Sequence, residues 1–521
     1  MTPKMDNRRS LWPALTLVVA MLAAGCGTTV HGAATSSTTG ADNFGAEAGA
    51  GAAGPGAAAA APGGTTVGGS DAAATTPSEL GSEGAGQATL STGSSAHGNY
   101  TAGAQAPARM QVSAKGAKTL LLGVRYCTDC SAGDAALGAA NLDPGNPLKD
   151  AEAVRDDINN HGGIAGLKVE LDVHRTTATS NINPQAQAAC AQWTQDHHVF
   201  AAFWGNNETL ESCMTRAGTP LINTDLSGAD QSTFARYPVY AESSSMNLDR
   251  VARVTVNGLD RQHFFTPGAV VGIASYDDPN YVKAVQHSLL PALKSHGITW
   301  KTPEFVHTPE SEGDLSNTSQ SAASAVLRMR TEGVTHVLLM DGAAGIQSGG
   351  ILTLEFMTQA QSQGWTPSYG LNSGNGLTAL AGDVPPTQLH NSLAVGWEPA
   401  YDESAADDPD SHANAARKRC VAIMAKAGLP ANNRNALAVQ LDTCDQFWFL
   451  QKVIEVGGDA ALTQAGFLRS IALLGSSYQS PLTFSTMFAA GRRDGVREVR
   501  NAKFVDGCTC FRYTSPPYVA G

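Results

Sequence analysis

Residues 148–174 constrain the fold more than any other stretch of the chain. The first half repeats apolar side chains at spacings of three and four residues, namely Leu148, Ala151, Val154 and Ile158. This spacing places them on one face of a helix. Two glycines end the helix, because glycine readily adopts a positive φ. Residues 167–173 then alternate apolar and polar side chains, as a strand with one buried face does. With the apolar run at 119–124, the stretch predicts a β-α-β unit in a parallel sheet.

The same alternation of strand-like and helix-like segments continues to about residue 505, although the sequence itself does not repeat. This alternation is typical of α/β folds with helices on both faces of a sheet. The chain has 521 residues, more than one compact core usually accommodates. We therefore expect two lobes of this kind.

One motif connects the chain to a known family. The pattern D-x-I-N-x-x-G-G-I-x-G-x-x-x-x-L, from Asp156 to Leu171, resembles the first crossover of type I periplasmic binding proteins. These are the solute receptors of ABC importers, typified by the leucine/isoleucine/valine-binding protein. The resemblance implies an α/β fold of two doubly wound parallel-sheet lobes, joined by a three-stranded hinge. It also implies a ligand held between the lobes.

The family's order of elements suggests where the lobes begin and end. We expect the first lobe to comprise residues 116–243 and 392–480. The second lobe is then expected to comprise residues 244–391 and 481–521. In this assignment the strand-like segment 393–397 returns the chain to the first lobe.

The N-terminus is typical of an exported lipoprotein. Basic residues precede a short apolar run, 11–24, which ends in Ala-Gly-Cys at Cys26. This ending resembles a bacterial lipobox, although Ala23 stands where leucine is usual. Residues 1–26 are therefore expected to be a signal peptide with a lipidated Cys26; a plain secretory signal with an incidental cysteine is the alternative. Residues 27–115 contain mainly Ala, Gly, Ser, Thr and Pro, which predicts a disordered tether.

Charge and family resemblance together indicate the partners. The net charge is −12 and no basic stripe occurs, which argues against nucleic acid. The resemblance implies a small-molecule ligand and the permease subunits of an ABC importer. Lipid on Cys26 would anchor the chain to the outer face of the cytoplasmic membrane, within the cell envelope.

The loops after the predicted strands supply the candidate ligand contacts, because open parallel sheets bind ligands at the carboxyl ends of their strands. The candidates from the first lobe are Trp204, Asn206, Asn207, Thr224, Asp225 and Ser227, and those from the second are Tyr281, Asp341 and Asn372. The resemblance implies that a residue near Asn206 and hydroxyls near Thr224 to Ser227 hold a ligand carboxylate together with backbone N–H groups, without a basic residue. It also implies that Tyr281 covers the ligand. The alternative is that each is a turn or cap residue.

One departure from the family concerns the ligand's ammonium group. Family members that bind amino acids carry an acidic residue where this chain has the neutral Asn372. Asp225 or Asp341 can replace it from another loop; otherwise the ligand is not an amino acid. We expect a small polar organic ligand that is amino-acid-like, an amide or related.

The cysteines agree with export. Apart from Cys26, eight of the nine cysteines remain, an even number. Their spacing predicts four pairs: Cys127–Cys130, Cys190–Cys213, Cys420–Cys444 and Cys508–Cys510. The two short pairs can also exchange partners with each other.

Two other functions stay open. Cys127-x-x-Cys130 after a strand favours an exported thiol–disulfide oxidoreductase as the enzyme alternative. A ligand sensor without transport is the other. No hydrolase, zinc-protease or nucleotide-binding motif occurs in the sequence, so we expect neither enzymatic activity nor a cofactor or metal.

Overall fold

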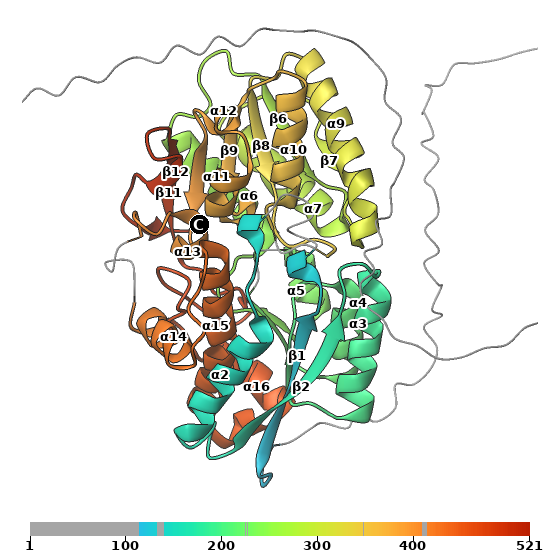
Figure 1. Cartoon of the computed structure of the whole chain (residues 1–521), viewed down its shortest axis with the longest axis vertical. Helices are drawn as coiled ribbons and strands as arrows, with labels where there is room; N and C mark the ends of the chain where they lie inside the picture. Colours follow the sequence, from blue (N-terminus) through green and yellow to red (C-terminus); the bar gives the residue numbers. More distant parts are fainter. Residues whose placement is uncertain (1–113, 133–139, 225, 227, 347–348, 409–413) are drawn as a thin grey trace, which may run out of the picture. The chain divides into compact units, whose positions relative to one another are not determined.

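The computed structural model describes residues 114–132, 140–224, 226, 228–346, 349–408 and 414–521, all within one compact unit (Figure 1). The predicted signal peptide, Cys26 and nearly all of the predicted tether lie outside the described residues. Within the described ranges, the strands form two sheets. No described helix is long and apolar enough to span a membrane.

The first sheet has five described strands in the order β2-β1-β3-β4-β5, and every pairing is parallel. Its strands are β1 (Thr119–Cys127), β2 (Lys168–Thr176), β3 (Ala201–Phe203), β4 (Leu221–Asn223) and β5 (Tyr240–Glu242). The helices between them are α2 (Pro147–Asn160), α3 (Ile182–Ala191), α4 (Glu208–Ala217) and α5 (Gln231–Arg236). The predicted β-α-β unit is therefore confirmed as β1, α2 and β2.

The glycine corner between α2 and β2 has a steric cause. Gly163 has φ +78°, and a Cβ at this position would lie 2.0 Å from the carbonyl oxygen of Leu167. Only glycine fits such a contact without displacing the chain. The apolar helix residues Val154 and Ile158 are buried, as their spacing predicts.

The second sheet repeats the strand order of the first in β7-β6-β8-β9-β10, followed by the antiparallel strands β11 and β12. Its described strands are β6 (Val271–Tyr276), β7 (Glu304–Val306), β8 (His336–Met340), β9 (Ser368–Asn372), β10 (Leu393–Gly396), β11 (Glu498–Val505), β12 (Cys510–Tyr513) and β13 (Tyr518–Val519). The helices along this part are α6 (Leu248–Arg261), α7 (Pro279–Ala284), α8 (Leu290–Ser295), α9 (Leu315–Thr331), α10 (Ile351–Ser362), α11 (Leu377–Asp383), α12 (Pro386–Leu389) and α13 (Pro399–Asp402).

Strand β10 differs from the sequence-based assignment. The segment 393–397 was assigned to the first lobe, but β10 pairs with β9 and β11 in the second sheet. The cause is that a short apolar run such as 393–397 indicates a buried strand without specifying its neighbours. The chain leaves the second sheet only after Gly396.

Three further helices belong to the core around the first sheet: α15 (Arg434–Gly457) and α16 (Gln464–Ile471) pack on its strands, and α14 (Ala415–Lys426) packs on α2 and α15. The ring of Phe447 lies 5.0 Å from that of Phe203, and the ring of Phe467 lies 5.8 Å from that of Phe200. Figure 1 shows α15 beside α2. Helix α15 therefore extends to the end of the first sheet at which the carboxyl termini of β1 and β3 lie.

The segments that pass between the sheets are joined by buried polar contacts. The carboxylate of Asp494 accepts hydrogen bonds from Arg250 at 2.5 Å and from the side-chain amide of Asn247 at 3.1 Å. Arg250 and Asp494 are only 8% and 3% exposed. A buried ion pair of this kind fixes the relative course of two crossing segments.

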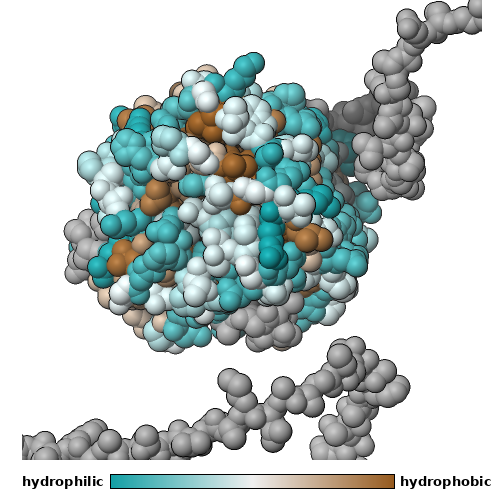
Figure 2. All heavy atoms as spheres, turned by 90° about the horizontal axis from the view of Figure 1, so that it is seen from above, coloured by the Kyte–Doolittle hydropathy of each residue, from teal (hydrophilic) through white to brown (hydrophobic). Residues whose placement is uncertain are grey.

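The surface seen in Figure 2 is largely hydrophilic, with apolar residues in small, separate groups. This face offers no continuous apolar surface among the described residues.

Candidate functional site

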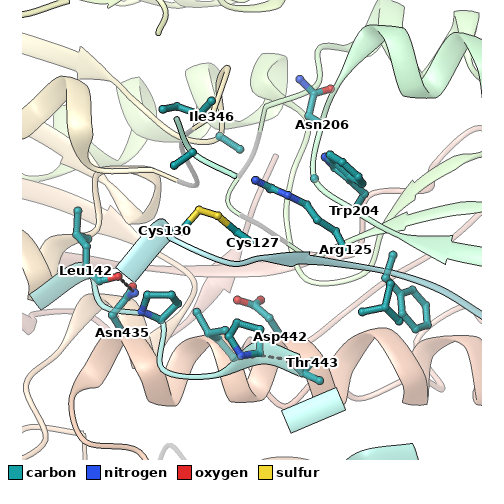
Figure 3. Close-up of a pocket in the computed structure, with 18 of the residues that line it drawn as sticks. Arg125, Cys127, Cys130, Leu142, Trp204, Asn206, Ile346, Asn435, Asp442 and Thr443 are labelled. Atoms are coloured by element: carbon teal, nitrogen blue, oxygen red, sulfur yellow. Dashed lines mark hydrogen bonds between the residues drawn. A yellow bond between two sulfur atoms is a disulfide. The ribbon is translucent and has the colours of Figure 1, made fainter. Parts of the chain in front are cut away.

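A cavity of about 220 Å³ lies at the carboxyl ends of β1 and β3. Its lining includes Arg125 and the Cys127–Cys130 pair at the end of β1, and Trp204 and Asn206 in the loop after β3. The loops on the side of the second sheet contribute Glu312, Leu315, Ala343, Gly345 and Ile346. Figure 3 shows the labelled side chains above α15, from which Asp442 and Thr443 point toward the cavity.

Arg125 supplies a cation to this cavity. Its guanidinium carbon lies 4.9 Å from the centroid of the Trp204 ring, and its Nε donates to Thr176 Oγ1 at 3.1 Å. The Trp204 ring packs in turn against Trp193, at 5.8 Å between centroids, and is 4% exposed. A cation–π contact with a fixed ring restricts the orientation of the guanidinium. Arg125 was not among the residues predicted from the sequence; a charged side chain near the end of a largely apolar strand was the available signal.

Asn206 and Asn207 are neighbours with different surroundings. Asn206 Nδ2 donates to the Gly228 carbonyl at 3.2 Å, while its buried Oδ1 has no hydrogen-bond partner among the described residues. A buried acceptor without a partner beside a cavity is available to a ligand donor. Asn207 Oδ1 instead accepts from Leu210 N at 3.0 Å and caps α4.

One face of α15 forms a second wall, which the sequence analysis also missed. The lining residues on this helix are Asn435, Val439, Asp442, Thr443 and Gln446. Asp442 Oδ2 accepts from the Tyr401 hydroxyl at 2.9 Å, and Gln446 Nε2 donates to Thr224 Oγ1 at 3.1 Å. The predicted residue Thr224 is buried behind Gln446 and is not part of the lining. Polar residues on one face of a strongly apolar helix were the signal for this wall.

The predicted residues of the second sheet lie behind the lining. The hydroxyl of Tyr281, a fully buried residue, donates to the Ala343 carbonyl at 3.2 Å. Asn372 Oδ1 accepts from Gly374 N at 2.8 Å. Neither residue belongs to the lining. Direct ligand contact by Tyr281 and Asn372 therefore stays a prediction.

Asp341 is engaged in the protein itself. Its Oδ2 accepts from Thr353 N at 2.9 Å and from Thr353 Oγ1 at 2.7 Å, in the first turn of α10. Its Oδ1 accepts from Gly342 N at 2.7 Å. Burial raises the pKa of Asp341 to about 6. Asp341 is outside the lining, so its contact with a ligand stays a prediction. Asp225 and Ser227 lie outside the described residues.

Loops of the two sheets meet around the cavity. Ala343 N donates to the Leu226 carbonyl at 3.2 Å, and Glu312 N donates to the Ala178 carbonyl at 2.9 Å. Ile182 N donates to the Glu310 carbonyl at 3.0 Å. The cavity therefore has walls from both sheets.

The described cysteines form the predicted pairs, which are confirmed at Cα–Cα distances between 5.2 and 6.2 Å. The short pairs Cys127–Cys130 and Cys508–Cys510 each close on themselves rather than exchange partners. Only the first of the described pairs lines the cavity.

Comparison with known proteins identifies the arrangement. No protein-family model matches the chain, and no curated protein matches its sequence. Solved structures do match. A possible leucine/isoleucine/valine-binding protein from Rhodopirellula baltica SH 1 aligns with a TM-score of 0.54 at 14% identity, over 77% of this chain and 97% of that one.

Two other solved structures are similar to the same extent. A fatty acid ABC transporter substrate-binding protein from Thermomonospora curvata has a TM-score of 0.54 at 14% identity, covering 77% of this chain and 92% of that one. A solute-binding protein from Rhodopseudomonas palustris BisB5, in complex with 3,4-dihydroxybenzoic acid, has a TM-score of 0.54 at 15% identity. The alignment covers 77% of this chain and 98% of that one. At these identities the likeness establishes a shared fold.

Proposed function

The chain has the fold of type I periplasmic binding proteins, and from this fold we propose that it is an exported solute-binding protein of an ABC importer. It captures a small polar organic ligand in the cavity and delivers it to the permease subunits. The proposal includes export and anchoring of the chain to the membrane through lipid on Cys26.

The cavity between loops of both sheets is the observation that carries the proposal. Trp204 and Asn206 line it from the first sheet, and Ala343 and Ile346 line it from the side of the second. A ligand that contacts both walls gains interactions only when the walls are together. Such differential contact is the physical basis for a receptor that closes on its ligand.

The polar groups of the cavity favour a ligand that bears an acidic group and a hydrogen-bond donor. The guanidinium of Arg125 suits a carboxylate, because it donates in a planar fork. The Asn206 Oδ1 and the Asp442 carboxylate are acceptors for a donor on the ligand. The names of the structural neighbours cover leucine/isoleucine/valine, fatty acid and dihydroxybenzoic acid, so the fold accommodates ligands of several classes.

A thermal-shift screen tests the proposal. It would cover amino acids, amides, small aliphatic and aromatic acids, and polyamines. A ligand at 100 times its Kd stabilises the folded state by about 2.7 kcal/mol and raises the Tm, if it binds only the folded chain. A confirmed hit that binds Asn206→Ala as tightly as wild type would contradict the assignment of the cavity. No hit in any class would contradict solute binding.

Two alternatives are tested separately. Insulin reduction assays would detect the exported oxidoreductase that the sequence leaves open, and turnover there would replace the proposal. Import of a confirmed ligand by cells with and without the gene would separate transport from sensing.

A further inference from the structure

The Cys127–Cys130 disulfide is the one described crosslink that lines the cavity; Cys508, in the other short pair, is exposed but is not part of the lining. Cys127 and Cys130 are half-buried and line the wall of the cavity (Figure 3). Cys420 and Cys444, in contrast, are fully buried. Because thiol–disulfide exchange requires a thiolate to reach a sulfur atom, access decides which disulfide reacts. We propose that Cys127–Cys130 is a reversible thiol–disulfide exchange site that controls the contact between the loops of the two sheets.

The short ring closed by this disulfide holds the loop that follows β2. Within the ring, Asp129 Oδ1 accepts from Ala178 N at 2.7 Å, and Asp129 Oδ2 accepts from Thr179 Oγ1 at 3.2 Å. Thr128 N donates to the Thr176 carbonyl at 2.9 Å. The disulfide therefore closes a turn whose Asp129 carboxylate and Thr128 N–H are bonded to residues 176–179.

The same loop carries the contact with the second sheet. The Ala178 carbonyl accepts from Glu312 N at 2.9 Å, so one residue bonds Asp129 on one side and Glu312 on the other. A second contact lies at Asn181 and Asn183, whose Nδ2 atoms donate to the Glu310 carboxylate at 2.7 Å and 3.2 Å. A continuous path of hydrogen bonds thus joins the disulfide ring to the cavity residue Glu312.

The reaction requires an external dithiol. Its thiolate attacks the sulfur of Cys127 or Cys130, which forms a mixed disulfide and releases the other cysteine as a thiolate. The second thiol of the dithiol then displaces the chain, which leaves two cysteine thiols and an oxidised dithiol. The reverse exchange with an oxidised dithiol restores the ring.

Opening this ring leaves the fold in place. In the chain-entropy model a disulfide stabilises more when it closes a longer loop. Cys127 and Cys130 are three positions apart, whereas Cys420 and Cys444 are 24 apart. Reduction of the short ring therefore releases the turn at Asp129 rather than the core. The consequence for ligand affinity rests on the proposed function, but the exchange itself does not.

Graded reduction tests the site. The full chain would carry Cys508→Ser and Cys510→Ser, which removes the other short disulfide. It would be treated with increasing dithiothreitol, alkylated with iodoacetamide and mapped by mass spectrometry. We expect Cys127 and Cys130 to be alkylated at a dithiothreitol concentration at least about tenfold lower than Cys420 and Cys444, because access limits exchange.

Hydrogen–deuterium exchange then tests the control of the loop contact. After selective reduction, peptides covering 177–183 and 308–314 should exchange at least about tenfold faster, because their amides lose fixed partners. Cys127→Ser/Cys130→Ser should show the same change without dithiothreitol, and Asp129→Ala should show it with the disulfide intact. Exchange in α15 should stay unchanged and serves as the control.

Either of two results would overturn the inference. One is reduction of Cys127–Cys130 only together with Cys420–Cys444. The other is unchanged exchange at 177–183 and 308–314 after the ring has opened. Because neither measurement uses a ligand, failure here is distinguishable from failure of the proposed solute binding.

Discussion

At the scale of single residues, adjacent side chains with the same chemistry have different roles. Asn206 presents a buried acceptor at the cavity, whereas Asn207 caps α4. The sequence predicted both as ligand contacts, because an asparagine after a strand suits a ligand and a cap equally. The two roles differ because Asn206 bonds through its Nδ2 to the Gly228 carbonyl, whereas Asn207 bonds through its Oδ1 to Leu210 N. The missing signal is three-dimensional, and no local pattern contains it.

This pair gives a matched prediction. Asn206→Ala should weaken binding of a confirmed ligand by about 1–3 kcal/mol, because a ligand donor loses its buried partner. Its effect on stability should be small, since the Gly228 carbonyl keeps a bond from Asn280 at 3.3 Å. Asn207→Ala should instead lower the free energy of unfolding by about 1 kcal/mol through loss of the cap. Calorimetric titration and urea unfolding of both variants check this prediction. Equal ligand affinities of Asn206→Ala and Asn207→Ala would contradict it.

Glu211 predicts a pH dependence of stability. It is fully buried, both carboxyl oxygens have no hydrogen-bond partner among the described residues, and burial raises its pKa from 4.5 to about 8. Between about pH 4.5 and 8 the folded chain keeps this proton while the unfolded chain loses it. The free energy of unfolding therefore falls as the pH rises through this window, by about 5 kcal/mol at most.

Glu211→Gln should remove that part of the pH dependence, because glutamine stays neutral. Urea unfolding of wild type and variant between pH 5 and 8.5 measures the difference. The exposed Glu170→Gln is the control and should follow wild type. Parallel pH profiles for wild type and Glu211→Gln would show that folding does not raise the pKa of Glu211.

At the scale of elements, local patterns predicted what local sterics decide. The corner at Gly163 and the buried face of α2 followed from glycine spacing and from apolar periodicity. The sheet of β10 did not follow, because its partners β9 and β11 are chosen by packing of distant segments. The wall formed by α15 was missed for the same reason: Asp442 and Gln446 are on the cavity side only because α15 packs at the end of β1.

The crosslink between α14 and α15 gives a prediction at this scale. Replacing Cys420 and Cys444 by alanine should lower the free energy of unfolding by about 3 kcal/mol, because the closed loop is long. Replacing Cys508 and Cys510, which are only two positions apart, should lower the free energy of unfolding by about 2 kcal/mol less than replacing Cys420 and Cys444. Urea unfolding of the two double variants measures the difference. Equal losses would indicate that strain or packing, rather than loop closure, sets the contribution.

At the scale of the whole molecule, one residue, Ala343, links the loops of the two sheets at the cavity. Ala343 donates its N–H to the Leu226 carbonyl, on the side of the first sheet. Its own carbonyl accepts from the Tyr281 hydroxyl. Tyr281 is fully buried. We therefore expect it to affect closure through the position of Ala343.

Removing only the hydroxyl of Tyr281 tests this role in the whole molecule. Tyr281→Phe keeps the ring packed at 5.5 Å from Tyr276 but frees the Ala343 carbonyl. We expect ligand affinity to fall by about 0.5–1.5 kcal/mol, the net contribution of one hydrogen bond, and the Tm of the ligand-free chain to change little. Small-angle scattering with and without ligand should show wild type becoming more compact and the variant doing so less.

Tyr276→Phe is the control, because the Tyr276 hydroxyl accepts from Leu352 N, away from the cavity loop. Only contacts that differ between the open and closed states can favour closure, so a purely structural hydroxyl should leave the change in compactness intact. If both variants lose the same degree of compaction, Ala343 does not link closure to the cavity. If wild type binds its ligand with no change in shape, the two sheets do not act as a hinged receptor. A loss confined to Tyr281→Phe, in contrast, would place the closing contact at Ala343, the residue that hydrogen-bonds to both sides of the cavity.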